Sequence, residues 1–203
     1  IVVNTVGPFG VFSLKFIDAL AERPLLYLDV CGEQQFVKRS YETLDDRARE
    51  RGATIVHACA FESFLADLLA NRLIEKDEPL EELASFYWFE RFLTSPGTRL
   101  TMRLVDHFET HAVEERRYVT RKPEAPIEVS DLPFGETRDQ ALFTPYPEVL
   151  FFNERFDVQT VTSNVLLTQG EARLMSRPQN RTQKSIDEIV ELDSSHNGIG
   201  IYG

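Results

Sequence analysis

The stretch IVVNTVGPFG, residues Ile1–Gly10, decides the fold of this chain. Its first six residues form an apolar, largely β-branched run, which is the pattern of a strand buried within a parallel sheet. Gly7 and Pro8 then end the strand in a loop. Native chains seldom open inside such a run without Met, so we expect a further segment to precede Ile1 in the complete protein.

Two more strands follow, each succeeded by a helix. Apolar residues at helical spacing predict the helices, and Pro24 and Gly52 mark the ends of the first two. The expected elements are strands at Ile1–Val6, Leu25–Val30 and Thr54–Cys59, and helices at Phe12–Leu20, Gln34–Arg51 and Ser63–Ile74. Strands that alternate with helices predict a parallel sheet with right-handed crossovers. Three of them make one half of a doubly wound dinucleotide-binding domain.

Beyond about residue 76 the pattern changes. A polar hinge at Glu75–Pro79 leads to an aromatic-rich strand, and Ser95 with Pro96 then begins a helix that we expect to reach Val113. Further strands are expected at Leu83–Leu93, Arg117–Arg121, Ile127–Val129, Val149–Phe152, Phe156–Leu167 and Ile186–Leu192. Crossover helices are absent from this pattern, which predicts a mainly antiparallel sheet.

The predicted fold class is therefore α/β. The second half of a Rossmann-type parallel sheet occupies residues 1–75, and an α+β domain with a mainly antiparallel sheet, for substrate or dimerisation, occupies residues 76–203.

The composition narrows the class of function. A net charge of -11, from 33 acidic and 22 basic residues, argues against nucleic acid and against an anionic membrane surface as partners. No apolar run approaches the roughly 18 residues of a membrane span, and no signal peptide is visible. Two cysteines cannot build a disulfide framework or a cysteine-rich zinc site. We therefore expect a reduced, cytoplasmic setting.

The first two strand ends carry the candidate chemistry, because ligands of open α/β sheets bind outside the carboxyl ends of the strands. A turn at Gly7 and Pro8 lets the backbone approach a flat ring that Phe9 could pack against, although such a turn is also typical of an ordinary loop. Asp29 is an acid inside an apolar run, which indicates a paired group or a cap. Glu33 is placed to meet a substrate or ribose, or to cap the helix that follows.

Two further groups argue less strongly for a site. His57 and Cys59 would share one side of the third strand, as a catalytic cysteine and its base would need. A reactive thiolate needs electropositive surroundings, however, and the nearby side chains are acidic. This favours a small, buried Cys59 without a catalytic role. His107 and His111 would share a helical face. Phe108 stands where zinc proteases carry Glu, and we expect no metal site.

The three strand ends, taken together, resemble one family. The segments NTVGPF (Asn4–Phe9), YLDVCGE (Tyr27–Glu33) and IVHACAFES (Ile55–Ser63) are similar in order and spacing to the saccharopine dehydrogenase-like oxidoreductases, which include saccharopine reductases and trans-acting enoyl reductases. The resemblance is specific over about residues 1–70. It implies a Rossmann-type domain followed by an α+β domain, and hydride transfer between NAD or NADP and a small-molecule substrate of the imine or enoyl type.

The resemblance also implies which residues form the site. The cofactor-binding positions would be Val6, Gly7, Pro8 and Phe9 at the first strand end, Asp29, Gly32 and Glu33 at the second, and Phe61 and Ser63 at the third. No catalytic residue can be assigned, because most of the chemistry of hydride transfer belongs to the cofactor.

The sequence departs from the family pattern in ways that affect the cofactor. Cys31 replaces a hydroxyl residue, Ala60 replaces a glycine, and the glycine-rich fingerprint G-x-G-x-x-G is missing from the three strand ends. We therefore expect NADP or NAD to bind the complete protein but not this chain alone. Two alternatives remain: a non-catalytic scaffold that dimerises through its sheet, or one subunit of a split enzyme. An unpaired strand at Ile1–Val6 predicts a homodimer or association with a preceding segment.

Overall fold

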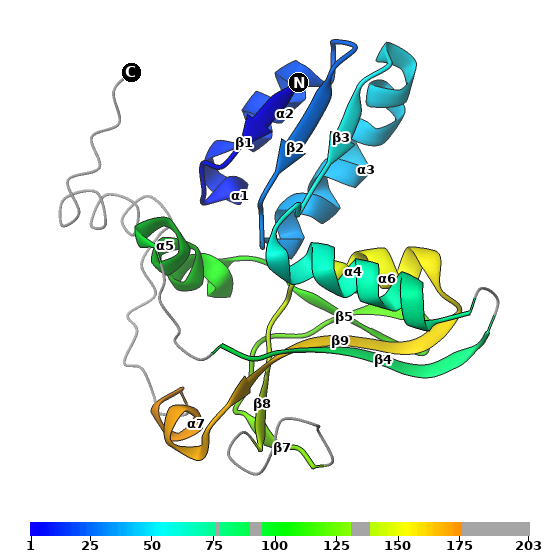
Figure 1. The fold of residues 1–203 in the computed structure, drawn as a ribbon. Coiled ribbons are helices and arrows are strands. Elements are labelled where there is room, and N and C mark those ends of the chain that lie inside the picture. The colour runs from blue at the N-terminus through cyan, green and yellow to red at the C-terminus, as the bar shows by residue number, and fades with distance from the viewer. Residues whose placement is uncertain (76–77, 90–94, 131–138, 176–203) are drawn as a thin grey trace.

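The computed structural model describes residues 1–75, 78–89, 95–130 and 139–175, and in them the chain forms two sheets joined by helices (Figure 1). The first part consists of β1 (Val2–Asn4), α1 (Phe9–Phe12), α2 (Leu14–Leu20), β2 (Leu26–Asp29), α3 (Gln34–Arg51), β3 (Thr54–Val56) and α4 (Phe61–Leu73). Its three strands are parallel and lie in the order β1-β2-β3. The predicted parallel half-sheet, sheet A, is confirmed.

Helix α3 shows how the sequence specifies this part. Its apolar side chains recur at helical spacing, so that Phe36, Val37 and Leu44 are buried against sheet A while charged side chains face outward. Gly52 adopts a left-handed conformation with φ of 71°, and its N–H bonds to the carbonyls of Ala48 and Arg49. A residue with a side chain would be strained there, so the predicted glycine cap is confirmed.

The second sheet, sheet B, is mainly antiparallel, as predicted. The elements are β4 (Leu80–Tyr87), α5 (Pro96–Leu104), a 3-10 turn η1 (Val105–His107), β5 (His111–Glu114), β6 (Arg117–Thr120), β7 (Ile127–Glu128), β8 (Gln140–Phe143), α6 (Glu148–Arg155), β9 (Val158–Leu167) and α7 (Gln169–Met175). The strand order is β6-β5-β9-β8-β7, and β4 pairs in parallel with β9. The long central strand β9 thus holds sheet B together.

Several predicted elements differ from the structure. Residues Val149–Phe152 were expected to form a strand but belong to helix α6, because a short apolar run does not by itself distinguish a strand from a buried helix. The helix that begins at Pro96 ends at Leu104 instead of Val113, and Phe108 is already extended. Strand β8 and helix α7 were not expected. The predicted strand at Ile186–Leu192 and the end of that at Leu83–Leu93 lie outside the described residues.

Helix α6 links the two parts of the chain. Its Leu150 belongs to the core beneath sheet A, whereas Val149 and Phe152 belong to the core that α4 and α6 form on sheet B. Figure 1 shows α4 and α6 side by side above sheet B. The division into domains at residues 75 and 76 stays a prediction. None of the described helices has the length and apolar character needed to cross a membrane.

Candidate functional site at the strand ends of sheet A

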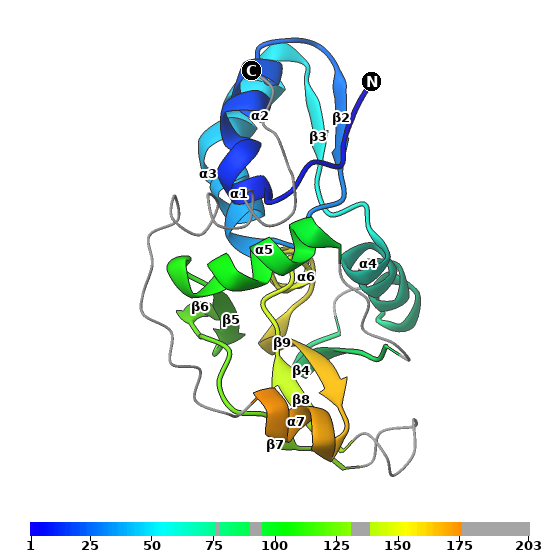
Figure 2. The same ribbon diagram turned by 90° about the vertical axis from the view of Figure 1, so that its left-hand side faces the viewer.

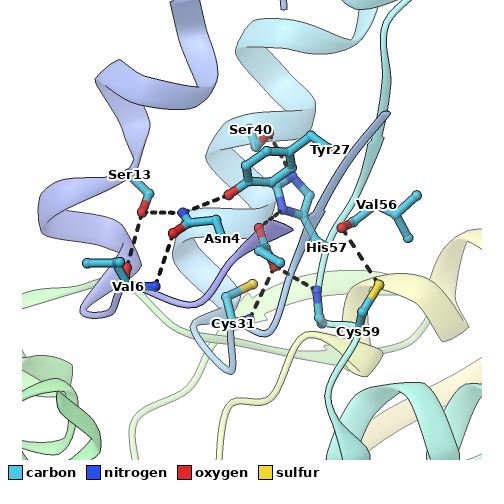
Figure 3. Close-up of polar contacts among 11 residues, drawn as sticks. Asn4, Val6, Ser13, Tyr27, Cys31, Ser40, Val56, His57 and Cys59 are labelled. Carbon is cyan, nitrogen blue, oxygen red and sulfur yellow. Dashed lines mark hydrogen bonds and ion pairs between the residues drawn. The ribbon is translucent and has the colours of Figure 1, made fainter. Parts of the chain in front are cut away.

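The turn after β1 is held by hydrogen bonds of the Asn4 side chain. The peptide bond between Gly7 and Pro8 is cis. The Asn4 side chain accepts from the Val6 N–H at 3.0 Å and donates to Ser13 Oγ at 2.9 Å and Tyr27 Oη at 3.0 Å (Figure 3). Val6 itself remains 61% exposed, so its side chain stays at the surface.

Phe9, in contrast, points into the core. It is 6% exposed, and its ring centroid lies 5.8 Å from that of Phe36 on α3. The ring therefore holds α1 against α3. Of the four residues expected at the first strand end, Val6 is exposed and Gly7 is half-buried, whereas Pro8 and Phe9 are buried.

The Glu33 carboxylate fixes the same turn from the end of β2. Its two oxygens accept from the backbone N–H groups of Phe9 and Gly10, each at 2.7 Å, and Thr101 Oγ1 of α5 donates to it at 3.2 Å. Burial raises the pKa of Glu33, although these hydrogen bonds oppose the shift. The Glu33 side chain caps α1, which lies 24 residues earlier in the chain; Glu33 is also the N-cap residue of α3, as the sequence suggested, but its side chain makes no cap hydrogen bond to that helix.

Asp29 and His57 form a buried pair beneath the strand ends (Figure 3). His57 Nδ1 lies 2.6 Å from Asp29 Oδ2, and His57 Nε2 lies 2.8 Å from Ser40 Oγ on α3. The other oxygen of Asp29 accepts from the N–H groups of Cys31 and Ala58. Burial alone would raise the pKa of Asp29, but the hydrogen bonds from His57 and these amides outweigh it and lower the pKa. The expectation that Asp29 is a paired group is confirmed.

Asp29, Cys31 and His57 bring three metal-ligating atoms within 4.8 Å of one another among the residues that the structure describes. The oxygens of Asp29 are already used by His57 and by two amides, and a separation of 2.6 Å is that of a hydrogen bond. This cluster is a hydrogen-bonded network. His107 lies in η1 and His111 in β5, so the expected shared helical face is wrong.

Cys59 does not lie beside His57 as the sequence suggested. Strand β3 ends at Val56, and Ala58 has a left-handed φ of 56°, which turns the chain between the two side chains. His57 is buried, whereas Cys59 is half-buried, so the expected buried Cys59 is wrong. Burial still raises the pKa of the Cys59 thiol, with the Asp29 charge as the next cause. That shift opposes thiolate chemistry.

At the third strand end, Ser63 points inward. Its hydroxyl donates to Glu148 at 2.7 Å, and Ser85 and Tyr87 of β4 donate to the other oxygen of the same carboxylate. Glu148 is completely buried at the start of α6, and this burial raises its pKa despite the three hydroxyl donors. The carboxylate thus ties α4, α6 and sheet B together. Phe61, by comparison, is 55% exposed.

Two hydrogen bonds, which we call the clasp, connect helix α3 of the first part to strand β5 of sheet B. The side-chain amide of Gln34 donates to the His111 carbonyl at 2.9 Å and accepts from the His111 N–H at 2.7 Å. A side chain placed at Gly32, two residues earlier, would contact only the ring of Tyr146. The sequence offered no sign of Gln34, Thr101 or Glu148, because each meets its partners from a distant segment.

Comparisons with known proteins give the same family as the strand-end motifs. No protein-family model matches the chain. A protein of Arabidopsis thaliana named as a saccharopine dehydrogenase-like oxidoreductase is 40% identical over 68 residues, 34% of this chain and 15% of the relative's length. A protein of Mycobacterium tuberculosis named as a trans-acting enoyl reductase is also 40% identical over 68 residues, 16% of its length.

A lipid droplet localized protein of Caenorhabditis elegans is 30% identical over 97 residues, 48% of this chain and 22% of its own length. The matched stretches therefore span less than a quarter of these relatives. Within that partial stretch, the resemblance to the saccharopine dehydrogenase-like and trans-acting enoyl reductase family is confirmed.

Proposed function

We propose that this chain is part of a nicotinamide-dependent oxidoreductase, which transfers hydride between NADH or NADPH and an imine-type or enoyl-type substrate. The observation that carries the proposal is that the Glu33 carboxylate accepts hydrogen bonds from the backbone amides of Phe9 and Gly10, an arrangement we call the clamp. This clamp holds the Gly7–Pro8 turn at the carboxyl end of β1, where a doubly wound sheet binds its dinucleotide. The names of the partial relatives support the same class of reaction.

The accessible residues suit the nicotinamide end of such a cofactor. Val6 presents an exposed, uncharged side chain to a flat ring, and Phe61 adds an exposed aromatic side chain at the third strand end. Asp29, Glu33 and Ser63 are buried and bonded within the protein, so they shape the site instead of touching the cofactor. The cofactor, when bound, would supply the hydride.

The phosphates need a different binding element. None of the three strands of sheet A is followed by a G-x-G-x-x-G turn, whose backbone N–H groups at a helix start would bind the pyrophosphate. We therefore assign that role to another part of the complete protein. The cytoplasmic setting and the homodimer stay predictions.

Titration with NADPH and NADH tests the proposal on this chain and on the product of the complete gene. We expect the complete product to bind one of them and this chain to bind neither. In the complete product, Val6→Glu should weaken binding by about tenfold, since it puts a charge against the ring. Thr54→Glu, at the opposite end of sheet A, should not. A complete product that binds neither cofactor would refute the proposal that the protein is an oxidoreductase.

One observation favours a second candidate, a non-catalytic assembly module. All three polar side chains expected at the site, those of Asp29, Glu33 and Ser63, are fully engaged by the protein itself. Such a module would keep its fold and bind no nicotinamide cofactor even when complete, so the same titration separates the two candidates.

A further inference from the structure

Helix α4 turns its large apolar side chains away from the rest of the protein. Its inner side is made of small residues: Ser63 and Ala70 are buried, and Ala66 packs against the core on sheet B. The outer side carries five large apolar residues that are 46% to 77% exposed, which we call the outer stripe: Phe64, Leu65, Leu68, Leu69 and Leu73. Phe61, also exposed, begins the same side of the helix next to the strand ends of sheet A.

The spacing of these residues is that of a helix face covered by another element. Apolar residues on the outer side recur from Phe61 at i, i+3, i+4, i+7 and i+8, which is the pattern of a helix surface that faces a core. A helix that is apolar on both sides is normally buried. Figure 2 shows α4 on the side of sheet A away from α1, α2 and α3. Among the described residues, no element covers the outer stripe.

The two ends of α4 carry opposite charges. Glu62 lies in its first turn and Arg72 in its last. Neither forms an ion pair within the part of the chain that the structure describes, whereas Asp67, midway between them, is paired with Arg155 at 2.6 Å. Burial raises the pKa of Glu62, so a cation placed beside this carboxylate would stabilise its charged form.

These features match a second copy of the same helix. Glu62 and Arg72 are equally far from Asp67 at the middle of α4, and so are Leu65 and Leu69. A twofold axis through this middle makes the two helices antiparallel, so each residue lies opposite the one at the same distance on the other side. Glu62 then meets the partner's Arg72, and Leu65 meets the partner's Leu69. The outer side of α4 is therefore complementary to itself.

The exposed area suffices for a dimer. A fully exposed side chain of this size offers roughly 150–200 Å², so the outer stripe contributes about 500 Å² from each copy. Two copies together would bury about 1,000 Å², the area from which a specific interface is expected.

We propose that α4 pairs antiparallel with α4 of a second copy of this chain. The two outer stripes pack against each other, and Glu62 of each copy forms an ion pair with the partner's Arg72. This surface differs from the edge of β1, because α4 follows β3 at the opposite edge of sheet A (Figure 1). The inference does not depend on a nicotinamide cofactor.

Sedimentation velocity over a range of concentrations tests the interface, on this chain and on the product of the complete gene. We expect a dimer that Leu68→Glu weakens at least about tenfold, because the substitution places an unpaired charge at the centre of the contact. Val3→Glu, at the edge of β1, should leave the affinity within about twofold. Both residues are more than half exposed, so thermal unfolding should show that both variants still fold. A monomer at every concentration, or a dimer that only Val3→Glu disrupts, would overturn the inference.

Exchange of the end charges tests the antiparallel arrangement. Glu62→Arg and Arg72→Glu should each weaken self-association at least about fivefold, because like charges then meet at both ends. Mixed in equal amounts, the two variants should form a heterodimer, since one copy has two positive ends and the other two negative ends. Native mass spectrometry distinguishes this heterodimer from the two homodimers. Statistical mixing of the variants would refute the pairing of Glu62 with the partner's Arg72.

Discussion

His57 Nδ1 lies 2.6 Å from Asp29 Oδ2, and both side chains are completely shielded from water. The pair joins the ends of β2 and β3, and Ser40 extends it to α3 through the second ring nitrogen of His57. Buried charged groups of this kind are strongly destabilising when they lose their partner. The strand ends beneath the proposed cofactor surface therefore depend on this contact.

Replacement of Asp29 should reveal that dependence. Asp29→Ala leaves His57 and the N–H groups of Cys31 and Ala58 without their acceptor, so we expect a loss of about 3–5 kcal/mol in the free energy of unfolding, measured by urea denaturation. Asp45→Ala breaks an exposed pair with Arg49 and should cost less than about 1 kcal/mol. Equal losses in the two variants would contradict a buried network.

Replacement of Glu33 should loosen the turn after β1. In Glu33→Ala, the N–H groups of Phe9 and Gly10 lose their acceptors, so their hydrogen exchange should accelerate and unfolding should become easier by about 1–3 kcal/mol. Glu33→Gln keeps one acceptor oxygen and should lose less. Glu50→Ala, on the exposed side of α3, is the control. Unchanged exchange at Phe9 and Gly10 would show that the carboxylate does not hold the turn.

The clasp of Gln34 on His111 can be tested by a pair of adjacent variants. Gln34→Ala removes both hydrogen bonds to the His111 backbone, and we expect a loss of about 1–3 kcal/mol in thermal or urea unfolding. Gln35→Ala removes only a contact of 3.4 Å to Glu33 and should cost less than about 0.5 kcal/mol. If Gln35→Ala were the more damaging change, the clasp would be unimportant.

Glu148 should make stability depend on pH. Its pKa in the folded protein is raised by burial, so the stability contributed by the protonated form is present below the ordinary pKa of 4.5 and is lost as pH rises through the raised value. Gln at this position is neutral at every pH. The free energy of unfolding of the wild type, minus that of Glu148→Gln, should therefore increase as pH falls from 7 to about 4.5.

The expected change is about 1.4 kcal/mol for each unit by which the pKa is raised. Both proteins contain the raised Glu33 and the lowered Asp29, so these groups cancel in the difference. A difference that stays constant between pH 7 and 4.5 would show that Glu148 titrates normally.

Sequence alone predicted the elements whose signals are local. Helix α3 begins and ends at the predicted residues, Gln34 and Arg51, because its apolar spacing is regular and Gly52 supplies the left-handed cap. Alternation of strands and helices also predicted the parallel sheet. Residues 149–152 were assigned wrongly, since four consecutive apolar residues carry no clear period.

The sequence thus determined the class of fold, the parallel half-sheet and the family resemblance of its three strand ends. It indicated that Asp29 is a paired group or a cap, because an ionised side chain in an apolar strand requires a partner. Only the tertiary structure decided which partner. Each of these hydrogen bonds joins residues that lie 23 to 85 positions apart in the sequence. This holds for His57 with Asp29, for the amides bound by Glu33 and for the Ser63 hydroxyl bound by Glu148, and the strand order and crossovers bring them together. Hydrogen bonds between distant segments have no period in the sequence, so the fold must be known before they can be assigned.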